Sequence, residues 1–198
     1  MLFNFVKPTY KLYQGVTMLS IGFGHVADTF TSLLGEFATI QSSNATVYPV
    51  INLLDKDKQP NGRTYPSEVP DHFSVAGLLK SGVVYNIFYR GGYALTPGRS
   101  QFIWEIDGED GTIRIEGSRD HGSFISLEEP DVYLNGDKVD LGSGLGPNNG
   151  AFYSVSSAWK AFAEGRTGEY ASIEDAVKNQ GILDAIEKSG ESGKIISL

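Results

Sequence analysis

The sequence of 198 residues contains no cysteine. Disulfide bonds, thiolate metal ligands and cysteine nucleophiles are therefore excluded, and the absence is typical of a reducing compartment. Long apolar runs are missing too, because none approaches the ~18 residues that span a membrane. The first segment contains Asn4, Lys7 and Pro8 where a signal peptide would have an unbroken apolar stretch. We therefore expect a cytoplasmic protein with no membrane partner.

Positive charge is scarce: 16 Lys and Arg residues face 24 Asp and Glu residues, which gives a formal net charge of −8. Such a chain repels phosphate backbones, so no nucleic-acid partner is expected. The Gly-x-Ser-x-Gly and Gly-x-x-x-x-Gly-Lys motifs of serine hydrolases and nucleotide triphosphatases are absent. His72 and His121 lack the spacing of metal ligands and are expected to be structural or surface residues. We predict no metal site.

Apolar residues make up 40% of the chain, enough for one folded core. We predict a single domain over residues 1–198, with residues 1–14 as a lead-in segment. The middle of the chain has the alternation and turn residues of paired strands. Residues 37–53 are rich in β-formers, and residues 55–70 are polar and proline-rich, so they are expected to form an exposed loop. Three hairpins follow: 73–79 with 83–89, 102–107 with 112–116, and 131–134 with 138–141 through the turn Asn135-Gly136.

Helices are predicted before and after these strands. One follows Gly24, one covers the apolar repeat at 152–162, and one opens at Ser172 with the capping pattern completed by Asp175 and ends near Gly190. This order predicts an α+β fold, an open, mainly antiparallel β-sheet with helices packed on one face. Trp104 and Trp159 lie on the apolar faces of their elements and are expected in the core.

The predicted strand 83–89 is apolar on both faces, since Tyr85 and Ile87 alternate with Val84 and Phe88. Helices can cover one of these faces. A partner subunit is the simplest cover for the other, because an uncovered apolar sheet face would aggregate. We therefore predict a homo-oligomer that forms through the sheet face.

The spacing Gly22-x-Gly24-x-x-Ala27 matches a loose dinucleotide-binding fingerprint. The apolar run before it is strand-like and a helix is predicted after it. A working fingerprint also needs a second parallel strand that ends in an acidic residue about 20 residues on. The first later carboxylate, Asp55, lies beyond a long strand, and hairpins follow it. We therefore predict no Rossmann domain and no cofactor-binding residue, and we expect the glycines to serve close packing.

Three motifs now occur in a characteristic order: GFGHVAD at 22–28, WEIDGEDG at 104–111 and EDAVKNQGILDAIEKS at 174–189. Together they resemble the C-terminal half of Gfo/Idh/MocA-type oxidoreductases. VPD at 69–71 and RGG at 90–92 are similar to the branch that contains the fungal galactose-pathway transcriptional repressor. The resemblance covers almost all of residues 14–192.

This resemblance implies a division of labour. In the family, an N-terminal Rossmann domain binds NAD or NADP and carries a Glu-Lys-Pro motif, while the C-terminal domain binds substrate and forms oligomers. The Glu-Lys-Pro triplet does not occur in this sequence. The chain therefore corresponds to the second half alone, with the Rossmann half as an implied partner and NAD or NADP as the cofactor of the full-length family.

His25 matches the family's active-site histidine, which implies that it accepts the proton of a sugar or polyol hydroxyl. The resemblance also implies that Asp28 contributes to substrate binding. The family commonly has an aspartate four residues before the histidine, but this sequence has Ile21 there, which neither accepts a proton nor forms hydrogen bonds. The alternative is structural: His25 would bond to nearby backbone at a helix start, and Asp28 would be a first-turn carboxylate favoured by the helix dipole.

Arg90, Tyr93 and Arg99 lie where a predicted strand runs into a Gly/Pro loop. From there an aromatic ring could stack on a sugar and a guanidinium could bond to its hydroxyls, so these residues are candidate substrate ligands. The alternative to substrate binding is structural: the arginines would pair with surface carboxylates, and the tyrosine would pack against its neighbours.

Two functions remain open at this stage, beside the possibility that the isolated chain only assembles through its sheet. The chain is the substrate-binding and oligomerisation half of an NAD(P)-dependent sugar or polyol oxidoreductase, inactive without its cofactor domain. Alternatively, it is a non-enzymatic regulator that binds a protein partner, for which a nuclear location also fits. Ile21 favours the second function and the general character of the family favours the first.

Overall fold

The computed structural model describes residues 17–55, 59–91, 100–117, 130–141 and 151–198. The chain divides into two compact units. Unit 1 combines residues 1–94 with residues 172–198, and unit 2 covers residues 95–171. Each unit is described by itself below.

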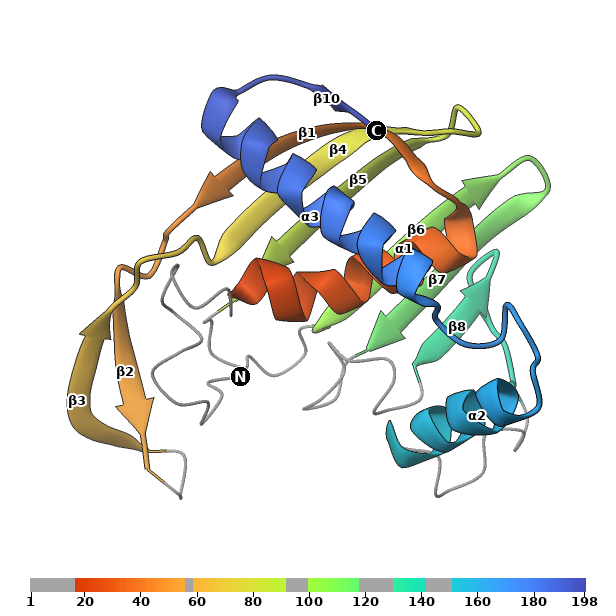
Figure 1. Cartoon of the computed structure of the whole chain (residues 1–198), viewed down its shortest axis with the longest axis horizontal. Coiled ribbons are helices and arrows are strands. Elements are labelled where there is room, and N and C mark those ends of the chain that lie inside the picture. Colours follow the sequence, from red (N-terminus) through yellow and green to blue (C-terminus); the bar gives the residue numbers. More distant parts are fainter. Residues whose placement is uncertain (1–16, 56–58, 92–99, 118–129, 142–150) are drawn as a thin grey trace. The chain divides into compact units, whose positions relative to one another are not determined.

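Unit 1 is built on a four-stranded antiparallel sheet in the order β10-β1-β4-β5 (Figure 1). Its strands are β1 (Phe37–Ala45), β4 (His72–Leu79), β5 (Val84–Arg90) and β10 (Ile196–Ser197). The β4–β5 hairpin pairs Phe73 with Tyr89 and Leu78 with Val84, as the sequence predicts. A separate hairpin pairs β2 (Val50–Leu54) with β3 (Pro60–Pro66). The stretch 37–53 is thus two strands, and the expectation of a loop over 55–70 is wrong for β3.

Helices α1 (Gly24–Leu34) and α3 (Ile173–Ser192) belong to unit 1, and α3 lies along the sheet (Figure 1). The capping box of α3 is confirmed, because Ser172 Oγ accepts from the backbone of Asp175 while the Asp175 carboxylate accepts from that of Ser172. The expected strand before Gly22 is wrong. Residues Met18–Phe23 form a π-helix, η3, capped by Thr17 and continuous with α1, because Phe23 and Gly24 both keep helical dihedrals.

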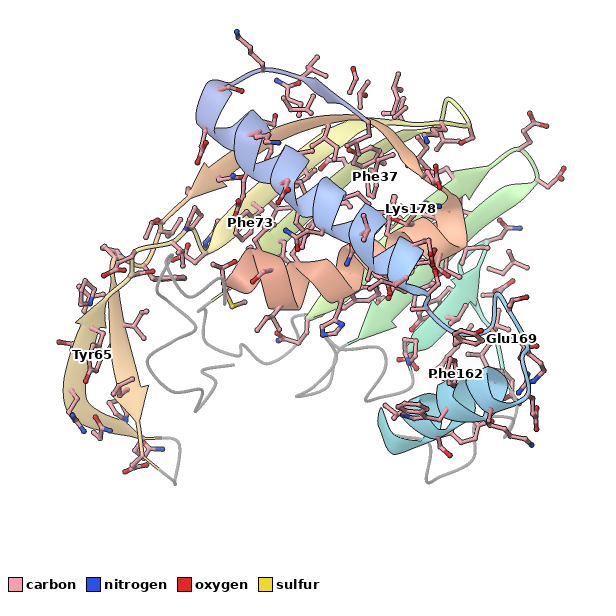
Figure 2. The ribbon with its side chains drawn as sticks, in the orientation of Figure 1. Phe37, Tyr65, Phe73, Phe162, Glu169 and Lys178 are labelled. Atoms are coloured by element: carbon pink, nitrogen blue, oxygen red, sulfur yellow. The ribbon has the colours of Figure 1, made fainter. Side chains whose placement is uncertain are left out.

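Aromatic side chains form the core between the sheet and the helices of unit 1. Phe73, from β4, and Phe37, from β1, are both buried there (Figure 2). Phe23 lies against Phe73 and Tyr89, with ring centroids 6.3 and 5.6 Å away. The inward face of β5 is therefore covered by helices, as predicted. On its other face Val84 is 78% and Phe88 61% exposed.

Unit 2 contains an antiparallel sheet in the order β6-β7-β8-β9. Its strands are β6 (Phe102–Gly108), β7 (Gly111–Gly117), β8 (Asp131–Leu134) and β9 (Asp137–Lys138), and its helix is α2 (Ala151–Ala163). The two predicted hairpins are confirmed, with β9 shorter than expected. Asn135 and Gly136 both have positive φ, as the turn requires. Trp104 is half-buried, but the core position expected for Trp159 is wrong, because it is 67% exposed.

None of the helices in the described part of the chain has the length and apolar character needed to cross a membrane.

Candidate functional site

His25 lies in the first turn of α1 and its side chain is exposed. Its backbone carbonyl accepts a hydrogen bond from Thr29 Oγ1 at 2.9 Å. Within the described residues, the imidazole itself makes no hydrogen bond. The structural alternative, in which the ring is tied to nearby backbone, therefore has no support here.

Asp28 is also exposed and follows His25 by three residues on α1, so the two side chains are neighbours on one helix face. The helix that carries Asp28 starts at Thr17, because η3 runs into α1 without a break. Asp28 is therefore not a first-turn carboxylate, and the helix dipole gives no reason for its presence. Ile21, one turn before His25, is 47% exposed. The face has one imidazole, one carboxylate and an isoleucine.

The glycines before His25 serve packing. A Cβ at Gly22 would overlap Tyr89 Oη, so a side chain at this position would require the Tyr89 ring to move. The Gly24 N–H is used within the helix, where it donates to Ile21 O and Leu19 O. A dinucleotide fingerprint needs a strand before the turn and free N–H groups for the pyrophosphate. Here a π-helix takes the place of the strand and the Gly24 N–H is not free, so these residues do not fit a nucleotide.

Asn179 of α3 holds the start of α1. Its Nδ2 donates to Gly24 O at 3.1 Å, while its Oδ1 is buried and has no partner within the described residues. The sequence did not single out this residue. The bond fixes α3 against the turn that carries His25.

Arg90 lies at the end of β5, on the face opposite the helices. Its guanidinium lies over the Phe88 ring, 5.7 Å from the centroid. Tyr89, the residue between them, faces inward toward Phe23. The structure therefore does not bring Arg90 together with His25 and Asp28. Tyr93 and Arg99 lie outside the described residues.

A second histidine is held more firmly. His72 Nδ1 is 2.6 Å from Asp71 Oδ1, and the buried Asp71 carboxylate also accepts from the backbone N–H groups of Val47 and Tyr48 at 2.9 and 2.8 Å. The sequence predicts only a structural or surface role for His72. Local spacing could not reveal this arrangement, because 23 or more residues separate the donors from Asp71. In the described part of the chain, no three His, Asp or Glu side chains converge as a metal site would require.

Comparison with known proteins identifies relatives of two kinds. The family described as "Gal80p, C-terminal domain" matches residues 2–117. The galactose/lactose metabolism regulatory protein GAL80 of Kluyveromyces lactis is 29% identical over 141 residues, which cover 69% of this chain and 30% of that protein. The dehydrogenase aclE of Aspergillus oryzae is 27% identical over 195 residues, which cover 96% of this chain and 51% of the relative. The chain thus spans about half of the length of aclE and less than a third of that of GAL80.

Solved structures show the same fold. A super-repressor mutant of Gal80p from Saccharomyces cerevisiae matches with a TM-score of 0.77 and 20% identity, over 98% of this chain and 52% of that one. Levoglucosan dehydrogenase in complex with NADH and L-sorbose matches with a TM-score of 0.64 and 22% identity, over 93% and 52%. The predicted α+β architecture, that of a Gfo/Idh/MocA C-terminal domain, is confirmed. This chain belongs to the Gal80p C-terminal domain family.

Proposed function

We propose that this chain is the substrate-binding and oligomerisation half of an NAD(P)-dependent oxidoreductase that acts on a sugar or polyol. The observation that carries the proposal is the exposed His25 imidazole, free of hydrogen bonds within the described residues and one turn from the exposed Asp28. The match of the dehydrogenase aclE over 96% of the chain supports it. So does the fold shared with a dehydrogenase in complex with NADH and L-sorbose.

The chemistry assigned to this half is proton transfer and substrate binding. His25 accepts the proton of a substrate hydroxyl, which is a role suited to an imidazole near neutral pH. Asp28 accepts a hydrogen bond from a neighbouring hydroxyl and so orients the substrate. Because Gly22 and Gly24 do not fit a nucleotide, the nicotinamide chemistry belongs to a separate nucleotide-binding half. Substrate roles for Arg90, Tyr93 and Arg99 stay predictions.

The test combines this chain with the part of the dehydrogenase aclE that the match does not cover, and measures NADH formation over a panel of sugars and polyols. We expect turnover that falls at least about 100-fold in His25→Ala, the usual range for loss of a general base. Ser32→Ala, at an exposed position of the same helix, is the matched control and should leave turnover unchanged. Full activity in His25→Ala would overturn the assignment.

A regulator that binds a protein partner is the second candidate. Ile21 favours it, since an isoleucine cannot share a proton with His25. Its relation to GAL80, a regulatory protein, also favours it. The same experiment separates the two functions. A complex that binds NADH and turns over no sugar would support the regulator.

Self-association through the outer face of the unit 1 sheet, the face opposite the helices, is the other part of the proposal. Val84 and Phe88 are exposed there, and none of the strands β1, β4, β5 and β10 contains an acidic residue. In a chain of net charge −8, two copies repel each other least through such a surface. Size-exclusion chromatography with light scattering should show a dimer or larger species at micromolar concentration. Val84→Glu should dissociate it, whereas Leu33→Glu, exposed on α1, should not.

A further inference from the structure

The side chain of Ile21 is the unexplained feature of the His25 site. It is 47% exposed, although isoleucine is among the residues most often buried in proteins. Single exposed apolar residues are common, so this exposure has no functional meaning by itself. What distinguishes Ile21 is its place, one turn before an exposed imidazole on a continuous helix. An apolar contact is thus available beside the proposed proton acceptor.

Ile21, His25 and Asp28 form one exposed row along this helix, called here the α1 row. They are spaced four and three residues apart, which places their side chains on the same face. Of the residues between them, four are buried: Gly22, Phe23, Gly24 and Ala27. At 1.5 Å per residue the row is roughly 10 Å long, so a single small ligand can reach all three side chains.

The start of the α1 row is held by three contacts. The capping box of Thr17 closes the first turn of η3. Gly22 lies against Tyr89 of β5, and Gly24 O accepts a hydrogen bond from Asn179 Nδ2 at 3.1 Å. The turn that carries the imidazole and the isoleucine is therefore ordered before a ligand binds. Such preorganisation lowers the entropic cost of binding.

We propose that Ile21 contacts the substrate at the carbon next to the reacting hydroxyl, and that this carbon has no hydroxyl group. The substrate is then a deoxy sugar, or another polyol with an apolar group at that position. This inference rests on the proposed function and names the substrate class of the same site. The α1 row also sets the orientation: the reacting hydroxyl lies at His25, the apolar carbon at Ile21 and a further hydroxyl at Asp28.

The chemistry of isoleucine explains this preference. A substrate hydroxyl placed against Ile21 would lose its water without gaining a partner, because the side chain has no donor or acceptor. A methyl or methylene group in the same place removes apolar surface from water on both molecules. One such group changes the specificity of an apolar pocket by about 10–200-fold. Because Ile21 lies on an open helix face, we expect the low end of this range, about tenfold.

The first experiment measures kcat/KM for this chain combined with the part of aclE that the match does not cover. The substrates are D-glucose, D-galactose and D-mannose, each with its single-deoxy analogues. One analogue should exceed its parent sugar about tenfold. Ile21→Val should keep this ratio, whereas Ile21→Thr, which replaces one methyl group of valine by a hydroxyl, should lower it to about one. Leu33→Thr, exposed near the far end of α1, is the control and should leave the ratio unchanged.

The outcomes separate this inference from the proposed function. Turnover with equal ratios in Ile21→Val and Ile21→Thr would overturn the inference and leave the proposed function standing. Turnover that is fastest with the parent sugars would do the same.

The second experiment measures binding without turnover. In the same complex the isoleucine methyl groups are isotope-labelled for NMR, and the Ile21 signal is assigned by its loss in Ile21→Val. The preferred deoxy analogue should shift this signal at a lower concentration than its parent sugar does. Such a shift without turnover would uphold the substrate class and overturn proton transfer by His25. Absence of both the shift and the turnover would overturn both proposals.

Discussion

The two four-stranded sheets in the described part of the chain differ in how their apolar faces are covered. In unit 1, α1 and α3 lie over one face, and the largest fully buried side chains, Phe23, Phe73 and Ile40 among them, are found there. In unit 2, Trp104, Ile106 and Ile115 share one face of the sheet but are only half-buried. Within the described residues, Ala161 is the buried apolar residue of unit 2.

This difference teaches that a strand pattern and a core are separate properties. Both sheets have the alternation that predicts strands, and both form them. Among the described strands of these two sheets, only those of unit 1, which lie under two helices, have apolar side chains that are fully buried. The stability of the protein should therefore depend mainly on unit 1, and substitutions at equivalent apolar positions of the two sheets should have unequal effects.

Replacement of Phe73 by alanine is the largest expected effect. The ring is 2% exposed and lies among Phe23 and Tyr89, so its loss leaves a cavity under the helices. We expect the free energy of unfolding to fall by about 3–5 kcal/mol. Ile113→Ala in β7, where the side chain is 39% exposed, should cost less than about 1.5 kcal/mol. Urea denaturation measures both, and equal losses would refute the comparison.

The contact between η3 and β5 gives the next effect. Gly22→Ala pushes a methyl group into Tyr89 Oη, and overpacking of this kind costs about 1–3 kcal/mol. At Gly24 a Cβ would lie 3.5 Å from Leu183 Cδ1, an ordinary contact, so Gly24→Ala should be neutral or slightly stabilising. Thermal unfolding of the two variants compares them. A tolerated Gly22→Ala would show that η3 is not held against β5.

Much of the fold could be predicted because its signals are local. The Asn135-Gly136 turn and the Ser172 capping box each lie within a few residues, and both are present. The strand expected before Gly22 failed because a short apolar run has no clear period. The capping box of Thr17 with Ser20 was the available signal for a helix. β3 was missed because of its prolines, which the strand tolerates at its two ends, Pro60 and Pro66.

The sequence likewise predicts some features of the candidate site and misses others. The exposure of His25 and Asp28 together on α1 follows from their spacing on one helix. Successive side chains of a strand point to opposite faces of the sheet. Because Tyr89 faces inward, Arg90 lies on the other face. The bonds of Asp71 to Val47 and Tyr48 could not be predicted, because they depend on how two distant segments meet in the folded chain.

The N-terminus of α3 offers a smaller test. Ser172 Oγ accepts from Asp175 N–H at 3.1 Å and caps the helix that covers the unit 1 sheet. Ser172→Ala should lower the free energy of unfolding by about 1 kcal/mol. Ser172→Asp keeps an acceptor at the cap and should recover most of the loss. Chemical denaturation distinguishes them, and an unchanged Ser172→Ala would mean that this helix end contributes nothing to stability.

The smallest effect concerns the exposed ion pairs that Glu36 forms with Lys80 and Lys178 in unit 1. Hydrogen bonds from Lys178 and Lys80, at 2.8 and 2.6 Å, lower the pKa of Glu36 from 4.5 to about 2. The folded state therefore favours the ionised carboxylate. Its stabilising contribution is present above pH 4.5 and is lost as the pH falls toward 2. Because all three groups are exposed, added salt should weaken it.

Glu36→Gln should remove the pH dependence of stability that the Glu36 carboxylate causes. The difference in urea midpoint between wild type and variant should be present at pH 6 in low salt, shrink between pH 4.5 and 2, and shrink again at 1 M salt, where screening acts over roughly 3 Å. Glu109→Gln, in the β6–β7 turn of unit 2, is the matched control, since Glu109 takes part in none of the ion pairs among the described residues. A pH-independent difference for Glu36→Gln would mean that the two lysines do not hold the carboxylate. The exposed ion pairs of Glu36 would then contribute nothing to the stability of unit 1, in contrast to its aromatic core.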